Sequence, residues 1–331
     1  MRNIFARLTI TIGALSAIVL LVLVAQGQLL MNTTPVGNAP KDLAITPDGR
    51  FAYLVNVGDD TVNVVAIQQD GILTNNIVAT IEVGSRPHDV IISEDGSLAF
   101  VSNRGEDTVS VIDTETQQVV NTIASGAGPY GGAVAPGFQL IYFANATGNS
   151  VTVIDTESFS MVAEISVGIK PEGLSITPDG TRAYVHNSGS ADVSVIDLAS
   201  NTVIHTITAE ETGGEGSEAL LITPDGQRAF VHYVKNDVIA VIDLNTNEVI
   251  EQLNLEGVGP YGGAIDPVRN ILYVSGFTNN SVLAIDITTL EVISSVSLGE
   301  GQGPQHMALT PDGRLIYVVN NSGNTLSALI R

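Results

Sequence analysis

The chain repeats one unit seven times, and this periodicity constrains its fold more than any other feature. Each unit carries variants of Thr-Pro-Asp-Gly, then Ala-Tyr-Val-x-Asn, then Thr-Val-x-Val-Ile-Asp. Turn residues separate four short runs of strand-forming residues in each unit except the last. A period in the low forties built from short strands is typical of propeller blades. We therefore predict an all-β, seven-bladed β-propeller with four-stranded antiparallel blades. The units begin at Pro40, Pro87, Pro129, Pro171, Ser217, Pro260 and Pro304.

The seventh unit is one strand short, because the chain ends after its third run at residues 326–330. Residues 28–40 resemble residues 118–129, which end the second unit. We therefore expect residues 29–36, approximately, to supply the outer strand of the last blade, which would close the ring and remove its open edges. Pro35 is tolerated there because an outermost strand has one free side. Residues 28–331 then form a single domain.

The first 27 residues differ in composition from the repeats. Arg2 and Arg7 precede an apolar run at residues 8–25, and Ala25-Gln26-Gly27 follows. This order predicts a secretory signal peptide and a periplasmic or secreted protein. The apolar run is also just long enough to span a bilayer, so the alternative is a retained anchor with the propeller facing outward. We expect membrane contact only in that alternative.

The composition excludes several kinds of function. The chain contains no Cys, which excludes disulfides, thiolate zinc sites, Cys-linked haem and a Cys nucleophile. Its formal net charge is −22, and removal of Arg2 and Arg7 with the signal peptide would make it −24. A surface this acidic repels phosphate backbones, so we expect no nucleic-acid binding. We interpret the acidity as a solvated exterior of a soluble monomer.

Positions that recur in the units are interpreted as structural. An aromatic residue at one position of every unit predicts packing between blades, and the Asp residues of the Pro-Asp-Gly segments are expected to form turns. The Asp residues that end the third runs should bond to nearby backbone groups. The aromatic residues are Tyr53, Phe100, Tyr142, Tyr184, Phe230, Tyr273 and Tyr317, the turn residues are Asp48, Asp179, Asp225 and Asp312, and the strand-end residues are Asp113, Asp155, Asp197, Asp243 and Asp286.

The repeats themselves resemble a known family. Ala-Tyr-Leu-Val-Asn at 52–56, Ala-Tyr-Val-His-Asn at 183–187 and Ile-Tyr-Val-Val-Asn at 316–320 are similar to the repeat of the YVTN β-propellers. The resemblance covers residues 40–331 and implies an exported propeller. Relatives by architecture include lactonase propellers and the propeller subunits of quinoprotein amine dehydrogenases, so the fold does not fix the chemistry. Blades five and six depart from the pattern, because Tyr233 and Gly276 replace the final Asn.

In contrast, the two residues that follow each unit start vary around the ring. The innermost strand of a blade borders the central channel, and its first residues face one mouth of that channel. Convergent polar groups at such a mouth are the default binding-site hypothesis, and the alternative is that they solvate a water-filled channel. The pairs are Lys41-Asp42, His88-Asp89, Tyr130-Gly131, Glu172-Gly173, Glu218-Ala219, Tyr261-Gly262 and Gln305-His306. The candidate ligand-binding residues are His88, Asp89, Tyr130, Glu172, Glu218, Tyr261, Gln305 and His306.

Three functions are compatible with this mouth. The first is a non-catalytic module without a cofactor that binds a protein or a small molecule, with Tyr130 and Tyr261 as stacking surfaces. The second is a lactonase-like hydrolase, in which some of His88, Glu172, Glu218 and His306 hold a divalent metal or act as acid and base. The third is the propeller subunit of an exported redox complex whose redox centre lies on another chain.

Two further expectations concern residues outside the mouth. Residues 209–216 lengthen one connection between blades, and we expect an irregular loop at the rim that is a candidate partner contact. His186, His205 and His232 lie in predicted second and fourth strands, where we expect hydrogen-bonded or surface histidines rather than ligands.

Overall fold

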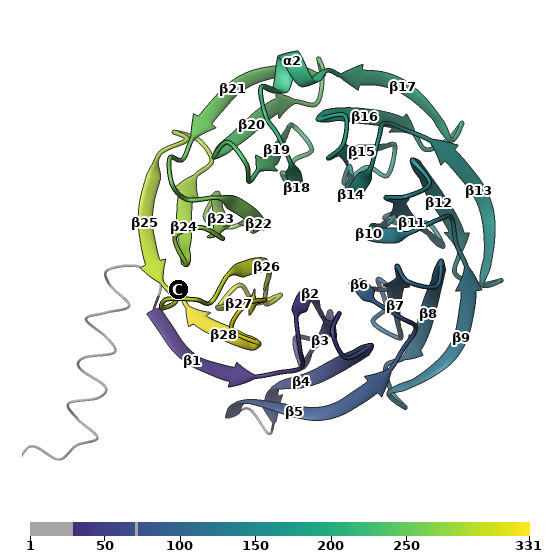
Figure 1. The fold of residues 1–331 in the computed structure, drawn as a ribbon, viewed down its shortest axis with the longest axis vertical. Helices are drawn as coiled ribbons and strands as arrows, with labels where there is room; N and C mark the ends of the chain where they lie inside the picture. The colour runs from purple at the N-terminus through teal and green to yellow at the C-terminus, as the bar shows by residue number, and fades with distance from the viewer. Residues whose placement is uncertain (1–28, 70–71) are drawn as a thin grey trace, which may run out of the picture.

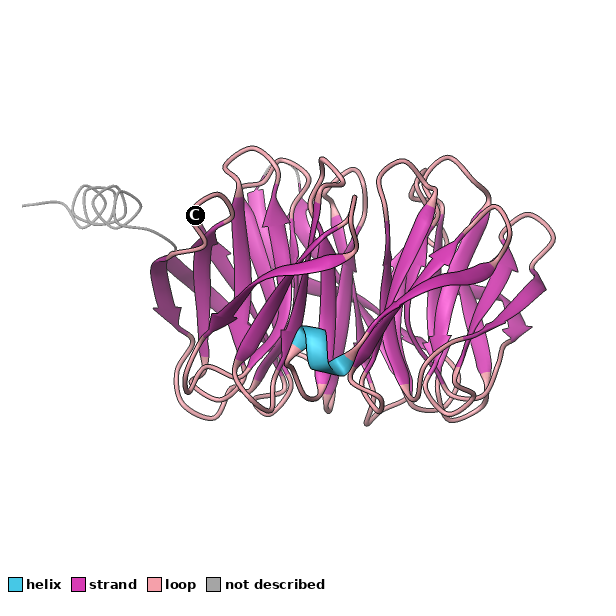
Figure 2. Ribbon diagram, turned by 90° about the horizontal axis from the view of Figure 1, so that it is seen from above, coloured by secondary structure: helices cyan, strands magenta, loops and turns pink. Residues whose placement is uncertain are grey.

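The structure, a computed structural model, describes residues 29–69 and 72–331 as a closed ring of seven four-stranded antiparallel sheets (Figure 1). The predicted seven-bladed propeller is confirmed. Seen from the side, the strands run between two faces at which the loops gather (Figure 2). The predicted signal peptide and the alternative anchor at residues 8–25 lie outside the described residues.

The strands of every blade follow one another from the channel outward, except in the last blade. The innermost strands are β2 (Pro40–Ile45), β6 (Pro87–Ile92), β10 (Pro129–Val134), β14 (Pro171–Ile176), β18 (Ser217–Ile222), β22 (Pro260–Asp266) and β26 (Pro304–Leu309). The second strands are β3 (Phe51–Asn56), β7 (Leu98–Asn103), β11 (Leu140–Asn145), β15 (Arg182–Asn187), β19 (Arg228–Tyr233), β23 (Ile271–Gly276) and β27 (Leu315–Asn320).

The outer half of each blade is a second hairpin, except in blade seven, where β28 pairs with β1 from the other end of the described chain. The third strands are β4 (Thr61–Gln69), β8 (Thr108–Asp113), β12 (Ser150–Asp155), β16 (Asp192–Asp197), β20 (Val238–Asp243), β24 (Ser281–Asp286) and β28 (Thr325–Ile330). The outermost strands are β5 (Ile72–Glu82), β9 (Gln118–Ala124), β13 (Ser160–Ser166), β17 (Thr202–Ile207), β21 (Glu248–Asn254), β25 (Val292–Ser297) and, in blade seven, β1 (Leu29–Pro35).

Strand β1 closes the ring as the sequence predicts. It pairs antiparallel with β28, from Leu29 opposite Ile330 to Pro35 opposite Thr325. The sheet order β1-β28-β27-β26 therefore joins the N-terminal part of the described chain to its end. Because the first and last strands share one sheet, opening the ring requires this ladder to separate.

The core lies between the blades rather than at the centre of the ring. Between blades four and five, for example, Tyr184, Val195, Val231 and Ile242 are fully buried in one cluster. The recurrent aromatic position is buried in every blade, which confirms its predicted role in packing between blades. Each blade is thus stabilised mainly by its two neighbours, as in other repeat architectures.

A second repeated device fastens consecutive blades on the face where the inner strands begin. The last residue of the turn between the second and third strands has a positive φ, and its side-chain oxygen accepts an N–H from the next connection between blades at 2.6–2.9 Å. Asn and Asp tolerate this left-handed conformation better than other non-glycine residues. The residues are Asp60, Asp107, Asn149, Asp237, Asn280 and Asn324.

Blade four has Ala191 at this position, and the inserted segment replaces the missing contact. Our expectation of an irregular loop at residues 209–216 was wrong for its first half, because Ala209–Thr212 form the short helix α2. The Thr208 and Glu211 side chains form a capping box at its N-terminus. The Thr212 hydroxyl then donates to the Ala191 carbonyl at 3.2 Å, which ties the insert to the turn of blade four.

The same insert explains why blade five lacks the usual Asn. A Cβ on Gly214 would lie 2.1 Å from Cγ of Tyr233, so the glycine packs directly on the tyrosine ring. In blade four, Gly168 packs in the same way on Asn187. Tyr233 is fully buried, so the connection into blade five packs on an aromatic ring where the connection into blade four packs on an amide.

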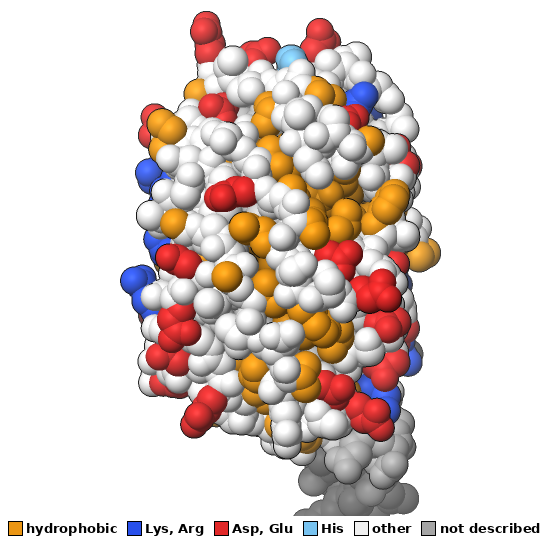
Figure 3. Space-filling model, turned by 90° about the vertical axis from the view of Figure 1, so that its right-hand side faces the viewer, with side chains coloured by type: hydrophobic (Ala, Val, Ile, Leu, Met, Phe, Trp, Pro, Cys, Tyr) orange, Lys and Arg blue, Asp and Glu red, His pale blue; other side chains and the backbone are white. Residues whose placement is uncertain are grey.

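The outer edges of the blades share one kind of bulge. In every outermost strand the pairing register skips one apolar residue that is 41–55% exposed, and β5 has a second shift opposite residues 66–68. A bulge bends a strand edge and disfavours pairing with another chain. Figure 3 shows hydrophobic side chains along the rim among acidic ones. The bulged residues are Met31, Val78, Val120, Val162, Ile204, Ile250 and Ile293. Within the described ranges, no helix has the length and apolarity needed to cross a membrane.

Candidate functional site

The variable residues at the starts of the inner strands converge at one mouth of the channel. In these strands the pairing register shifts just after the first residue, and such a bulge re-aims side chains. We call the following ten residues the mouth ring: Lys41, Asp42, His88, Asp89, Tyr130, Glu172, Glu218, Tyr261, Gln305 and His306. Seven of them are buried, and only the Asp42, Glu218 and His306 side chains are 18–21% exposed. The ring is therefore a packed polar layer that solvent reaches at a few points.

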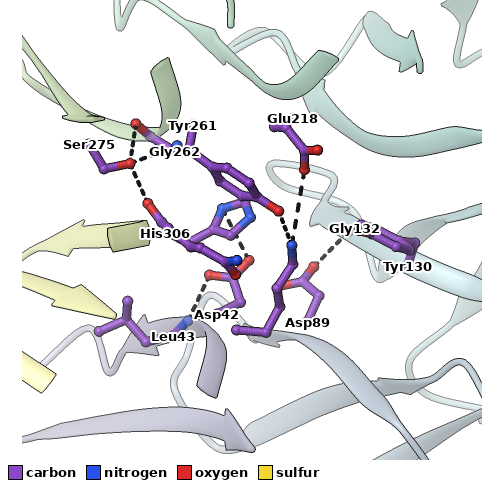
Figure 4. A network of polar contacts seen from close by, with 12 residues as sticks. Asp42, Leu43, Asp89, Tyr130, Gly132, Glu218, Tyr261, Gly262, Ser275 and His306 are labelled. Atoms are coloured by element: carbon purple, nitrogen blue, oxygen red, sulfur yellow. Dashed lines mark hydrogen bonds and ion pairs between the residues drawn. The ribbon is translucent and has the colours of Figure 1, made fainter. Parts of the chain in front are cut away.

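Lys41 is the main cation of this layer. Its ammonium donates a hydrogen bond to the Tyr261 hydroxyl and lies 4.0 Å from Oε2 of Glu218. It also lies 4.5 Å from the centroid of the Tyr261 ring and 5.8 Å from that of Tyr130. In Figure 4, dashed lines that start at the labelled Glu218 and Tyr261 side chains mark these two contacts. Because these partners belong to blades three, five and six, this one side chain from blade one links distant parts of the ring.

Burial shifts the pKa values of both Lys41 and Glu218. Desolvation lowers the pKa of Lys41, and the carboxylates of Glu218, Asp42 and Glu172 oppose this shift. Desolvation likewise raises the pKa of Glu218, and Lys41 opposes that shift. Each group therefore supports the charged form of the other in a site that disfavours isolated charges.

Two carboxyl groups from adjacent blades form a second centre. Asp42 and Asp89 hydrogen-bond to each other, and Asp89 also accepts the Gly132 N–H at 2.7 Å. Desolvation and then the charge of Asp89 raise the pKa of Asp42 well above its usual value, and desolvation raises the pKa of Asp89 to about 6. The two carboxyls therefore hold a proton between them, as expected for groups that cannot readily both ionise.

Neutral histidines flank this carboxyl pair. Nδ1 of His306 lies 3.5 Å from Oδ2 of Asp42, as drawn in Figure 4. Desolvation and then the charge of Lys41 hold the pKa of both His88 and His306 well below the usual value. The contact between His306 and Asp42 is therefore one between neutral groups, not an ion pair.

The aromatic residues of the ring are packed rather than open. The ring centroids of His88 and Tyr130 are 3.4 Å apart, and Tyr261 packs between Phe277 at 5.7 Å and the edge of His306 at 5.5 Å. Tyr130 and Tyr261 are only 8% and 6% exposed. The structure thus offers little free ring surface for the stacking that the sequence suggested.

The segment Gly-Pro-Tyr-Gly-Gly-Ala occurs twice, at residues 128–133 and 259–264, and the structure shows why a glycine follows each tyrosine. A Cβ on Gly131 would lie 2.7 Å from the Glu172 carbonyl oxygen, and one on Gly262 would lie 2.6 Å from the Gln305 carbonyl oxygen. These glycines allow the inner strands of adjacent blades to approach closely. They bring each tyrosine beside the ring residue of the next blade.

Two buried acceptors of the ring have no partner among the described residues. The Glu172 side chain is 5% exposed, and its Oε1 pairs with the Lys170 ammonium at 2.7 Å. Its Oε2 and the Oε1 of Gln305 accept no hydrogen bond. A buried acceptor left in this state destabilises the fold by about 1–3 kcal/mol. A ligand with N–H or O–H groups would gain affinity by donating hydrogen bonds to these two atoms.

A supporting layer of side chains lies directly under the ring. The Ser102 hydroxyl accepts the Asp89 N–H at 3.0 Å and donates to the Tyr130 carbonyl at 2.6 Å, and Ser275 donates to the Gln305 carbonyl. Nδ1 of His232 lies 3.2 Å from the Tyr261 carbonyl oxygen, and Nδ1 of His186 lies 3.2 Å from the Ser217 hydroxyl. These bonds fix the backbone from which the ring side chains project.

The three other histidines are found as the sequence predicted. Burial lowers the pKa of both His186 and His232 to about 4, so both are neutral. They hydrogen-bond within the supporting layer, whereas His205 is exposed on β17. Ser102, His186, His232 and Ser275 each occupy the next-to-last position of a second strand. The sequence analysis did not identify the supporting role of the two serines, although this shared position could have indicated it.

The proposed metal ligands are not gathered into one cluster. Across residues 29–69 and 72–331, no three His, Asp or Glu side chains are arranged to hold a metal ion. His88, Glu172, Glu218 and His306 all belong to the ring, but the ammonium of Lys41 lies among them. The sequence analysis counted Lys41 and Asp42 at the mouth but gave neither of them a role in binding, because their importance depends on contacts across the channel.

Comparison with known families agrees with this architecture. The profile described as YNCE-like beta-propeller matches residues 10–182, and the profile described as Lactonase, 7-bladed beta-propeller matches residues 156–330. Each match spans more than half of the chain. The chain belongs to the YNCE-like and lactonase-type seven-bladed β-propellers. This membership establishes the fold. The chemistry of the mouth has to be inferred from the residues that this chain places there.

The propeller is also similar to a solved structure titled Kuenenia stuttgartiensis Hydrazine Synthase. The two share 23% sequence identity with a TM-score of 0.79, over 92% of this chain and 98% of that one. At this identity the similarity shows a common fold alone. A search of curated proteins finds no match.

Proposed function

We propose that this protein is an exported binding module that holds a small polar ligand at the mouth ring without transforming it. The observation that supports this most is the contrast between the ring and the rest of each blade. The ring residues differ from blade to blade, converge from all seven blades and include two buried acceptors without partners. Export is inferred from Arg2, Arg7 and the apolar run at residues 8–25.

The ring is suited to recognition because its polar groups are held in place before any ligand binds. Ser102 and Ser275 fix its backbone, and the Asp42–Asp89 pair connects blades one and two. Groups that are already ordered lose little entropy when they bind a ligand. The partially exposed Asp42, Glu218 and His306 side chains provide the approach from solvent.

The test is a melting-temperature screen of purified protein against small polar solutes: sugars, amines, carboxylates and amino acids. A ligand that binds only the folded state raises the melting temperature with concentration. We expect at least one class to stabilise the wild type and the Lys235→Met variant, which alters an exposed lysine outside the ring, but not Lys41→Met. If every effective solute stabilised all three proteins equally, or if none had an effect, the small-ligand proposal would be wrong.

Lactone hydrolysis is the second candidate, because the lactonase profile covers the half of the chain that contains Glu172, Glu218 and His306. Turnover would require one ring carboxyl to activate water and another group to stabilise the carbonyl oxygen, with or without a divalent ion. The measurement is lactone hydrolysis before and after EDTA, by the wild type and by Glu172→Gln and Glu218→Gln. Activity that either substitution abolishes would replace the non-catalytic proposal.

A role as a subunit of an exported redox complex stays a prediction. The similarity to hydrazine synthase concerns the fold and carries no information on partners. Copurification of a redox-active protein with the tagged propeller, from cells that express the full chain, would favour this role over an independent binding module.

A further inference from the structure

Unpartnered acceptors of the mouth ring indicate one half of the ligand. Oε2 of Glu172 and Oε1 of Gln305 are buried and accept no hydrogen bond from the described residues. The first belongs to a carboxylate and the second to an amide, and they lie on blades four and seven, so each needs its own donor. An ammonium group has three N–H donors and a positive charge, so it suits the Glu172 carboxylate better than a neutral hydroxyl does.

Lys41 defines the other half. Its ammonium also carries three N–H donors, and the structure shows one hydrogen bond, to the Tyr261 hydroxyl. Oε2 of Glu218 lies 4.0 Å away, which is beyond hydrogen-bonding distance. The remaining donors suit an anionic acceptor, and a carboxylate can receive two of them.

The mouth carries charges of both signs close together. Lys41, Lys170 and Arg104 are positive, and Arg104 lies 5.4 Å from the Tyr130 ring. Glu172 and Glu218 are the nearest carboxylates of Lys170 and Lys41. A molecule that carries both a positive and a negative charge can therefore find a partner for each.

We infer that the mouth ring binds a small zwitterion of the amino-acid class, with its carboxylate at Lys41 and its ammonium at Glu172. This inference rests on the proposed binding function and specifies its ligand. Such a molecule would supply a donor to the unpartnered oxygen of Glu172, whose charge acts on Lys41, and an acceptor to the free donors of Lys41. The packed rings of Tyr130 and Tyr261 limit the space beside it to a compact side chain.

The test is isothermal titration of the wild type with a ligand series that separates the two charges. The series contains glycine, alanine, β-alanine, γ-aminobutyrate and glutamate as zwitterions, propionate as the carboxylate alone, propylamine as the amine alone, and glucose as a neutral polyol. We expect at least one zwitterion to bind about tenfold or more tighter than propionate, propylamine and glucose, because each charge-assisted contact contributes to its affinity.

Two substitutions then assign each charge to its residue. Lys41→Met should weaken zwitterion binding by about tenfold or more and leave propylamine binding unchanged, because it removes only the carboxylate partner. Glu172→Gln should weaken both zwitterion and propylamine binding and leave propionate binding unchanged. A merely structural role of either residue would weaken all ligands together. Lys235→Met is the matched control and should bind like the wild type.

The outcomes separate the ligand class from the proposed function. If propionate, propylamine or glucose bound as tightly as the best zwitterion, and Lys41→Met abolished that binding, the mouth would still be the binding site but the zwitterion inference would be wrong. If a zwitterion bound equally to the wild type, Lys41→Met and Glu172→Gln, both the inference and the proposed site would be wrong. If none of the zwitterions bound at millimolar concentration, the inference would fail.

Discussion

The two faces of the ring are built in opposite ways. On the face opposite the mouth, four blades repeat one turn, in which a Thr hydroxyl donates to the Asp two residues later at 2.5–2.6 Å. This bond is the main reason why the pKa values of Asp179 and Asp225 are lowered. The turn lies within one hairpin and contacts no distant blade, so each copy stabilises its own blade. These Asp residues thus form turns, as the sequence predicted.

At the mouth, the important contacts join different blades. Lys41 of blade one reaches Glu218 and Tyr261 of blades five and six, and Asp42 shares a proton with Asp89 of blade two. No residue of this layer has the same partners as its counterpart in another blade. The comparison shows that repetition marks local stabilisation, whereas variation marks groups that depend on one another across the ring.

On the repeated face, blade six departs from the common turn. We expect the largest loss of stability from a substitution at this position. It has Asp266 where four other blades have Thr, and this carboxylate is 1% exposed and forms an ion pair with the Arg331 guanidinium. Asp266→Ala would leave Arg331 buried without its partner. We expect the free energy of unfolding to fall by about 3–5 kcal/mol, measured by denaturant titration.

Two controls sharpen this prediction. The double variant Asp266→Leu with Arg331→Met removes both charges and should recover much of the loss, because apolar pairs can replace buried ion pairs. Arg269→Ala removes only the half-exposed guanidinium that lies 3.6 Å from Asp266, and it should have little effect. Equal destabilisation by Asp266→Ala and Arg269→Ala would contradict the importance of the buried pair.

The junction between blades four and five offers the next test. Gly214→Ala would place a methyl group about 2 Å from the buried Tyr233 ring, so the insert would have to move. Overpacking of this kind costs about 1–3 kcal/mol, and the melting temperature should fall accordingly. The comparison variant is Gly137→Ala, where no atom lies within 4 Å and only the positive φ of 71° opposes the methyl group. A smaller effect of Gly214→Ala than of Gly137→Ala would show that the insert is not packed on Tyr233.

The sequence predicted the ring but not the chemistry of its mouth. Seven copies of one pattern determine strands, turns and core together, and even the closing strand β1 could be identified from its likeness to another blade. The partnership of Lys41 with Tyr261 could not, because these residues are 220 positions apart and do not recur. The burial of Tyr130 and Tyr261 also depends on packing against His88, Phe277 and His306, which lie outside their strands, so no local pattern encodes it.

The carboxyl pair of the mouth predicts an unusual dependence of stability on pH. Folding raises the pKa of Asp89 from 3.8 to about 6 and that of Asp42 well above its usual value, so the folded state binds protons more tightly than the unfolded state. This stability is present at pH 4 and is lost as the pH rises through the folded pKa values. In Asp42→Asn, the amide can donate to Asp89 as the protonated carboxyl does. We expect this variant to be more stable than the wild type at pH 8, by on the order of 1–3 kcal/mol.

The measurement is denaturant unfolding of both proteins at pH 4, 6 and 8. The difference between them should be small at pH 4 and grow with pH, because Lys41 and His306, which face Asp42, are unchanged. Glu115→Gln, an exposed carboxyl on the opposite face, should show no such trend. A constant difference at all three pH values would mean that Asp42 and Asp89 do not share a proton.

The smallest effects are expected in the repeated turns, where they should also be uniform. Asp225→Ala and Asp312→Ala each remove a carboxylate that accepts one hydroxyl and one backbone N–H. Both carboxylates are exposed, so water replaces these bonds in part, and each loss should be about 1 kcal/mol or less. The two losses should add in the double variant, because the turns belong to the non-adjacent blades five and seven. In contrast, Lys41→Met and Glu218→Gln should not add, since each residue supports the charged form of the other. Additive losses at the mouth would mean that its residues act as independently as the turns do, and the division between the two faces would then be wrong.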